Sequence, residues 1–216
     1  MIDSTLKLKL FEYLGEHLVD IVNRRIYLVG DIELGVVETV VQHIHYLNSS
    51  LHVDNFNDPI TLLVNSVGGH DDMMLYLYDA ITLSDAEIVT IGSGTCCSAA
   101  ALILVSGDRR YCTSNAMFMT HKGKIQLEGD DDEIQAQAEI TKKISERYWK
   151  LIGRHTNKSA QWWYDKSKGG GELWLDADEM VKYGVVDAII SPSRRQLVSL
   201  SPRKLQTRTV SEDDDY

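Results

Sequence analysis

The sequence is poor in cysteine, with only Cys96, Cys97 and Cys112 among its 216 residues. An odd number, two of them adjacent, does not make the paired framework of a disulfide-rich secreted domain, and adjacent cysteines form a bridge only with strain. No Cys-x-x-Cys pair or Cys/His cluster has the spacing of zinc ligands. We therefore expect reduced thiols and a cytoplasmic protein, with no metal and no cofactor.

Long hydrophobic runs and excess positive charge are also lacking. No stretch of about 18 apolar residues occurs, and residues 1–10 alternate apolar with polar side chains, unlike a signal peptide. The 32 Asp and Glu outnumber the 22 Lys and Arg and give a net charge of −10. Because nucleic-acid binding needs clustered basic side chains, the sequence predicts neither a nucleic-acid nor a membrane partner.

Apolar residues are sufficient for a substantial core, at 44% of a chain whose length suits one domain. Short apolar runs alternate with segments of helical periodicity, which predicts βαβ crossovers and a largely parallel sheet. Strands are expected at 26–30, 60–65, 88–91, 110–112, 117–120 and 185–190, and helices at 6–22, 35–47, 71–83, 98–105, 130–153 and 177–182.

Ser98 lies at a predicted strand-to-helix turn. A serine nucleophile needs a neighbouring base and backbone N–H groups directed at the developing oxyanion, and the first N–H groups of a helix are free to act in this way. Gly68 and Gly69 form an equivalent turn one unit earlier, so the N–H groups of Gly69 and Ala99 would meet if the two strands are neighbours. The pattern alone equally allows a helix-capping serine and a structural His121.

Four motifs occur in the same order as in a known peptidase family. They are Asn65–Gly69 (Asn-Ser-Val-Gly-Gly), Gly94–Ala101 around Ser98, Asn115–His121, and Tyr183–Asp187 (Tyr-Gly-Val-Val-Asp). With the intervening segments, residues 24–190 resemble the Clp protease proteolytic subunit. The resemblance implies an α/β fold, the ClpP/crotonase-like ββα superhelix with a protruding long handle helix.

The resemblance also assigns roles to single residues. Ser98 takes the position of the nucleophile and His121 that of the base, while Gly69 and Ala99 supply the oxyanion hole. Glu172 stands where the family has the aspartate of the triad, and glutamate is able to orient a histidine. Asp176 and Asp178 are the alternatives for this acid. Substrate-binding positions are expected at Gly68, Lys122, Lys124 and Ile125.

The implied organisation has three parts. Residues 1–23 are a divergent N-terminal segment, 24–192 the peptidase domain with its handle at about 122–153, and 193–216 a polar tail that we expect to be disordered. The family forms stacked heptameric rings around a chamber, so we expect a homo-oligomer that receives unfolded polypeptide. An AAA+ unfoldase is a possible partner, although residues 1–23 lack the family's usual motif.

The sequence therefore predicts a serine endopeptidase that hydrolyses unfolded polypeptides inside an oligomeric chamber. Glu172, together with Val67 in place of the family's proline, favours the alternative of a catalytically inactive ring subunit that assembles with an active paralogue. A crotonase-like acyl-CoA enzyme is a third possibility, but it would need no Ser-His pair. Cys97 as nucleophile and a metal site at His70 are weaker alternatives.

Overall fold

The computed structural model describes residues 4–49, 58–123, 127–167, 171–190 and 207–208. Within these ranges the strands form one nine-stranded sheet of order β1-β2-β3-β4-β5-β8-β9, from which β6 and β7 branch at β4. The strands are β1 (Val19–Asp20), β2 (Arg25–Val29), β3 (Ile60–Ser66), β4 (Ile88–Cys97), β5 (Arg109–Thr113), β6 (Met117–Thr120), β7 (Leu173–Leu175), β8 (Ala188–Ile190) and β9 (Thr207–Arg208). The helices are α1 (Ser4–His17), α2 (Leu34–Asn48), α3 (Asp71–Thr82), α4 (Ala99–Val105), α5 (Asp131–His155), α6 (Ala160–Lys166) and α7 (Ala177–Lys182).

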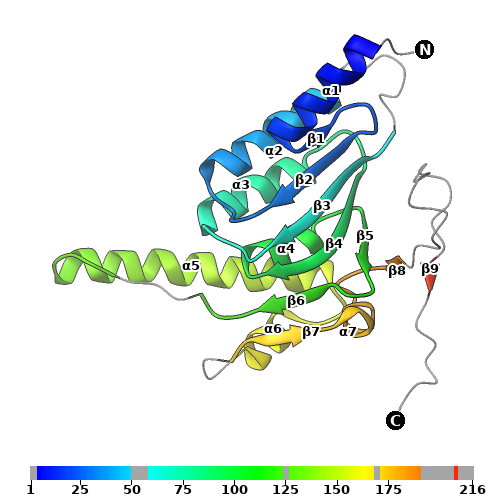
Figure 1. The fold of residues 1–216 in the computed structure, drawn as a ribbon. Helices are drawn as coiled ribbons and strands as arrows, with labels where there is room; N and C mark the ends of the chain where they lie inside the picture. The colour runs from blue at the N-terminus through cyan, green and yellow to red at the C-terminus, as the bar shows by residue number, and fades with distance from the viewer. Residues whose placement is uncertain (1–3, 50–57, 124–126, 168–170, 191–206, 209–216) are drawn as a thin grey trace.

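The central strands β2, β3, β4, β5 and β8 run parallel. Helices α2, α3 and α4 follow β2, β3 and β4 along the chain, and Figure 1 shows α2 and α3 side by side along the sheet. In β3 alternate residues are buried, beginning with Ile60, Leu62 and Val64, as the two-residue period of a strand requires. The predicted α/β fold with a largely parallel sheet is confirmed.

Strand β4 is long enough to pair with two different strands on the same side. Its residues 89–92 pair with β5, and its residues 95–97 pair with β6. Strand β6 in turn pairs antiparallel with β7. The carboxyl ends of β4 and β6 therefore lie next to each other, at the foot of the sheet in Figure 1.

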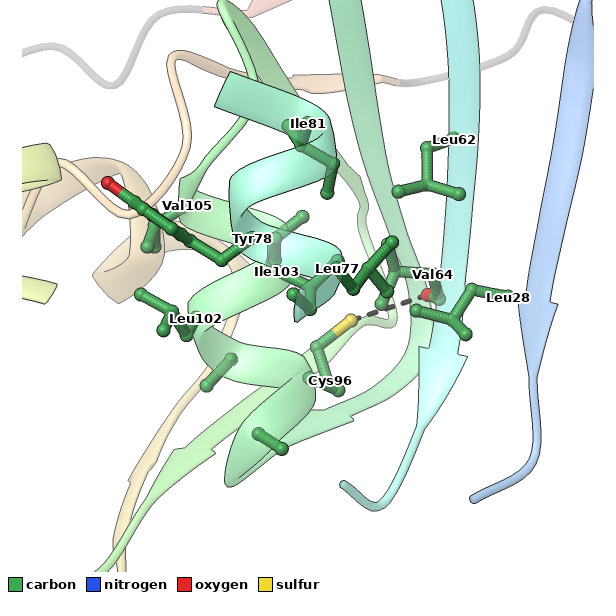
Figure 2. Packing of buried hydrophobic residues seen from close by; sticks show 14 of the residues in the cluster. Leu28, Leu62, Val64, Leu77, Tyr78, Ile81, Cys96, Leu102, Ile103 and Val105 are labelled. Carbon is green, nitrogen blue, oxygen red and sulfur yellow. Dashed lines mark hydrogen bonds between the residues drawn. The ribbon is translucent and has the colours of Figure 1, made fainter. Parts of the chain in front are cut away.

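Helix α4 lies at the centre of the core, with every residue from Ala99 to Val105 buried. Leu102 and Ile103 of this helix belong to the same buried cluster as Leu77 of α3 and Val64 of β3, part of which Figure 2 shows. Near the start of the helix, the Cys96 thiol donates a hydrogen bond to the Val64 carbonyl oxygen at 3.3 Å. The turn before α4 is therefore anchored in a tightly packed core.

Helix α5 is the long helix that the sequence predicts, and it projects beyond the sheet in Figure 1. A capping box between Asp130 and Glu133 starts it. Its buried residues are confined to its carboxyl-terminal third, whereas Ile140 in its middle is 58% exposed. None of the helices in the described ranges has the length and apolar character needed to span a membrane.

The amino-terminal helix is shorter than predicted. It ends at His17 and not at residue 22, and Gly15 lies inside it. Leu18 adopts a positive φ of 54°, which α-helical backbone does not tolerate, and Val19 then pairs with Ile26 in β2. Of the tail predicted to be disordered, only β9 is described, paired antiparallel with β8; its other residues lie outside the described ranges.

Candidate active site

Ser98 occupies a sharp turn between β4 and α4. Its φ of 55° and ψ of −119° are unusual for a residue with a side chain, and such backbone strain concentrates at functional sites. The Ser98 N–H donates to the Met119 carbonyl oxygen at 2.8 Å, continuing the ladder between β4 and β6. This hydrogen bond ties the turn to β6, and Ser98 remains partly exposed.

His121 follows the end of β6, immediately beside this turn. Because Cys97 pairs with Met119 in the parallel ladder, the next residues of both strands emerge together. The Ser98 Oγ and His121 Nε2 atoms are 2.9 Å apart. When the hydroxyl donates to Nε2, the imidazole proton must be on Nδ1, and the imidazole is then placed to accept the serine proton. The expected meeting of these side chains is confirmed.

Glu172 lies next to His121 in the backbone, but its carboxylate points elsewhere. Thr120 pairs with Leu173 in the antiparallel ladder of β6 and β7, so one step further brings residue 172 opposite residue 121. The Glu172 Oε2 accepts a hydrogen bond from the Trp174 indole at 3.0 Å, since residues two apart share one face of a strand. Among the described residues it makes no hydrogen bond to His121.

The alternative acids have other positions. Asp176 caps α7, where its Oδ1 accepts from the Glu179 N–H at 2.9 Å. Asp178 is exposed in the first turn of the same helix, and its charge contributes to the raised pKa of the Cys112 thiol. Of these three acids, Glu172 immediately precedes β7 and continues its register with β6 to a position opposite His121.

The Gly68–Gly69 turn packs directly against the turn at Ser98. Gly68 has a φ of 103°, and a Cβ atom there would lie 2.8 Å from the Ser98 Cβ and 3.0 Å from the Ala99 nitrogen. Hydrogen bonds from the Ile32 N–H to the Gly68 oxygen and from the His70 N–H to the Ile32 oxygen, both 2.8 Å, hold this turn in place. Within the described part of the chain, the N–H groups of Gly69 and Ala99 donate to no other group, so both are available to a ligand.

A cavity of about 580 Å³ opens beside Ser98 and Ala99. Ser98, His121 and Asp71 line it together with residues of α5 and α6. Burial raises the pKa of the Asp71 carboxyl, and the nearby charge of Asp72 raises this pKa further. The imidazoles of His121 and His70 act in the opposite direction. Ser98 and His121 thus line a cavity together with the Asp71 carboxyl group, and the sequence analysis did not predict that Asp71 lies there.

The predicted substrate-binding residues have different outcomes. Gly68 contacts the Ser98 turn, as described above. Lys122 lines the cavity, but its Nζ donates to the Tyr164 hydroxyl at 3.1 Å and lies 4.3 Å from the centre of that ring. Lys124 and Ile125 lie outside the described residues. The described residues on either side of them, Gly123 and Leu127, are not in a strand.

The cysteine and metal alternatives find no support. Burial raises the pKa of the Cys97 thiol to about 11, with a contribution from the charge of Glu172, so the reactive thiolate is scarce at neutral pH. Burial likewise raises the pKa of Cys96 and of Cys112 to about 12. In the described part of the chain no group of three His, Cys, Asp or Glu side chains is arranged to hold a metal ion.

Tyr148 of α5 is a second residue that the sequence interpretation did not connect with the site. Its hydroxyl donates to the Ser98 carbonyl oxygen at 3.1 Å, and its ring lines the cavity. The helical pattern identified Tyr148 only as part of an apolar face. No feature of the sequence relates it to a turn fifty residues earlier.

Comparison with known proteins gives consistent results over this region. Residues 15–193 match the family model described as Clp protease. The ATP-dependent Clp protease proteolytic subunit 2 of Pseudomonas aeruginosa is 30% identical over 173 residues, which cover 79% of this chain and 83% of that protein. The ATP-dependent Clp protease proteolytic subunit 1 of Rhodopirellula baltica is 27% identical over 179 residues, which cover 82% of this chain and 75% of that protein.

Proposed function

Because this chain belongs to the Clp protease family, we propose that it cleaves unfolded polypeptides with Ser98 as nucleophile and His121 as general base. The observation that carries this assignment is the 2.9 Å contact between Ser98 Oγ and His121 Nε2, at a turn with a strained backbone where Ser98 is partly exposed. A serine that only caps the helix, or a histidine with only a structural role, does not account for both the Ser98–His121 contact and the strained backbone. As an N-cap, Ser98 makes no side-chain hydrogen bond to the helix.

The proposed reaction proceeds through an acyl-enzyme. His121 Nε2 takes the hydroxyl proton as Ser98 Oγ attacks the peptide carbonyl carbon, and the resulting oxyanion accepts hydrogen bonds from the N–H groups of Gly69 and Ala99. The imidazolium then gives its proton to the leaving amine. Water, deprotonated by His121, attacks the ester and releases the second product with Ser98 restored.

Assembly into rings is part of the proposal. Helix α5 projects from the domain with a largely exposed surface that includes Ile140, and such a helix is suited to pair with a second copy. Stacked heptameric rings would enclose the cavity at Ser98 in a chamber. Both relatives are named as ATP-dependent, which supports an AAA+ unfoldase as the partner that delivers the polypeptide.

Covalent labelling tests the assignment of the nucleophile. We expect a fluorophosphonate probe to modify Ser98 in the folded protein, because this is the hydroxyl that the His121 imidazole contacts. Peptide mapping by mass spectrometry identifies the site. The Ser145→Ala variant is the matched control and should label normally, since Ser145 lines the same cavity but, among the described residues, has no hydrogen bond to a basic side chain. A folded protein that remains unlabelled contradicts the proposal.

An inactive ring subunit is the second candidate, favoured by the contact that holds the Glu172 carboxylate against Trp174. Under this alternative His121 lacks an orienting acid, and the chain contributes only to assembly. Cleavage of a fluorogenic peptide by the purified chain alone rejects it. No cleavage alone, but incorporation into rings with an active relative, supports it.

The role of Glu172 is tested by two substitutions, of which only the first should lower kcat. Glu172→Gln keeps the volume and removes the charge that would stabilise imidazolium, so kcat should fall by at least about tenfold. Trp174→Phe removes the competing indole N–H and should leave kcat unchanged or raise it. Initial rates at saturating peptide give both values. Wild-type kcat in Glu172→Gln would show that the triad acid lies elsewhere or is dispensable.

A further inference from the structure

Tyr148 contacts the backbone of the nucleophile and not its side chain. The residue is 8% exposed, and its hydroxyl donates to the Ser98 carbonyl oxygen at 3.1 Å. The ring packs edge-on against Trp149, with ring centroids 4.9 Å apart. The same carbonyl oxygen also accepts the Ala101 N–H at 3.0 Å. The oxygen is therefore held by α4 from one side and by α5 from the other.

This carbonyl belongs to the peptide group that carries the Ala99 N–H. A trans peptide is planar, with its C=O and N–H directed to opposite sides. Whatever sets the direction of the Ser98 oxygen therefore also sets the direction of the Ala99 N–H. The strained backbone of Ser98 makes such a restraint necessary, since sparsely populated conformations persist only when their surroundings determine them.

We propose that the Tyr148 hydroxyl is a positioning group for the oxyanion hole, which orients the peptide between Ser98 and Ala99 so that its N–H faces the substrate carbonyl. The inference rests on the proposed peptidase function. It assigns to α5 a role at the reacting centre through a hydroxyl that contacts the Ser98 carbonyl oxygen and not the nucleophile Oγ.

The chemistry of the contact supports a second effect of the same bond. A donor on a carbonyl oxygen polarises the amide and strengthens the hydrogen bond that its N–H makes in turn. Burial raises the pKa of the Tyr148 phenol, and the neighbouring Asp71 and Cys97 raise it further. The hydroxyl therefore remains protonated, and able to donate, throughout the working range of a serine peptidase.

Tyr148→Phe removes the hydroxyl and keeps the ring. We expect kcat to fall about three- to tenfold, the size set by one ordinary hydrogen bond, with KM unchanged, because the oxyanion hole is used mainly in the transition state. The affinity for a peptide aldehyde, whose adduct carries an oxyanion, should fall by the same factor. The affinity for the product peptide should not change. Tyr148→Met, which retains an apolar side chain without a donor, should show the same pattern.

Tyr78→Phe is the matched control. Tyr78 is also a buried tyrosine, and its hydroxyl bonds to the His155 imidazole at the end of α5 at 2.9 Å. This variant should keep both kcat and aldehyde affinity. An active wild type with unchanged kcat and aldehyde affinity in both Tyr148 variants overturns the positioning role and leaves the peptidase assignment intact. A wild type that neither cleaves peptide nor labels with a fluorophosphonate overturns both.

Discussion

Replacing Ser98 with alanine is expected to reduce peptide hydrolysis by a factor on the order of 10⁵ to 10⁶, with no loss of folding. The hydroxyl is the atom that forms the acyl-enzyme, and no other described side chain in the cavity pairs with His121. Among the described residues the removed oxygen has one side-chain partner, the His121 imidazole, so the loss of folding stability should be small. Initial rates with a fluorogenic peptide and a thermal unfolding curve measure the two effects separately.

The double substitution of Ser98 and His121 sharpens this prediction. Groups that act as one unit are strongly non-additive, so His121→Ala alone should lose nearly as much rate as Ser98→Ala, and the double variant should lose no more. Independent losses that multiply would contradict the proposed pairing. Substantial activity in Ser98→Ala would exclude Ser98 as the nucleophile.

A methyl group at Gly68 is the second change with a large expected effect. In Gly68→Ala the new Cβ would lie 2.7 Å from the Cys97 carbonyl oxygen and 2.8 Å from the Ser98 Cβ. Real Cβ atoms do not approach backbone so closely, so the glycine turn must move away from Ser98 and take the Gly69 N–H with it. Loss of one oxyanion donor typically costs 10²- to 10³-fold in kcat, and we expect a decrease of about 100-fold.

Gly30→Ala separates this steric effect from backbone strain. Gly30 also has a positive φ, 91°, but a Cβ atom added there would meet no atom within 4 Å apart from those of the adjoining residues in the chain. Both variants should lose about 1–2 kcal/mol of folding stability from the conformation itself, whereas only Gly68→Ala should lose activity. Equal kcat values for the two variants would show that the contact between the glycine turn and the Ser98 turn is not needed for catalysis.

Much of the site was predictable because its parts lie at the ends of regular elements. The apolar run of β4 followed by the Ala-rich α4 locates the turn at Ser98, and the motif order locates His121 after β6. The ladder register between Cys97 and Met119 then brings them together. Glu172 illustrates the limit. The family resemblance places Glu172 at the position of the triad acid, but the sequence does not specify which N–H group its carboxylate accepts from, the Trp174 indole or the His121 imidazole.

Local patterns by themselves determined the α/β class, the long α5 helix and the strand-to-helix turns, because apolar periodicity and glycine placement are properties of neighbouring residues. Tertiary packing alone decided the strained φ of Ser98, the close packing of the Gly68 turn against it, and the Tyr148 contact across fifty residues. Such features arise only when separate elements dock, and the direction in which a hydroxyl or peptide group then points is set by partners that no stretch of sequence contains.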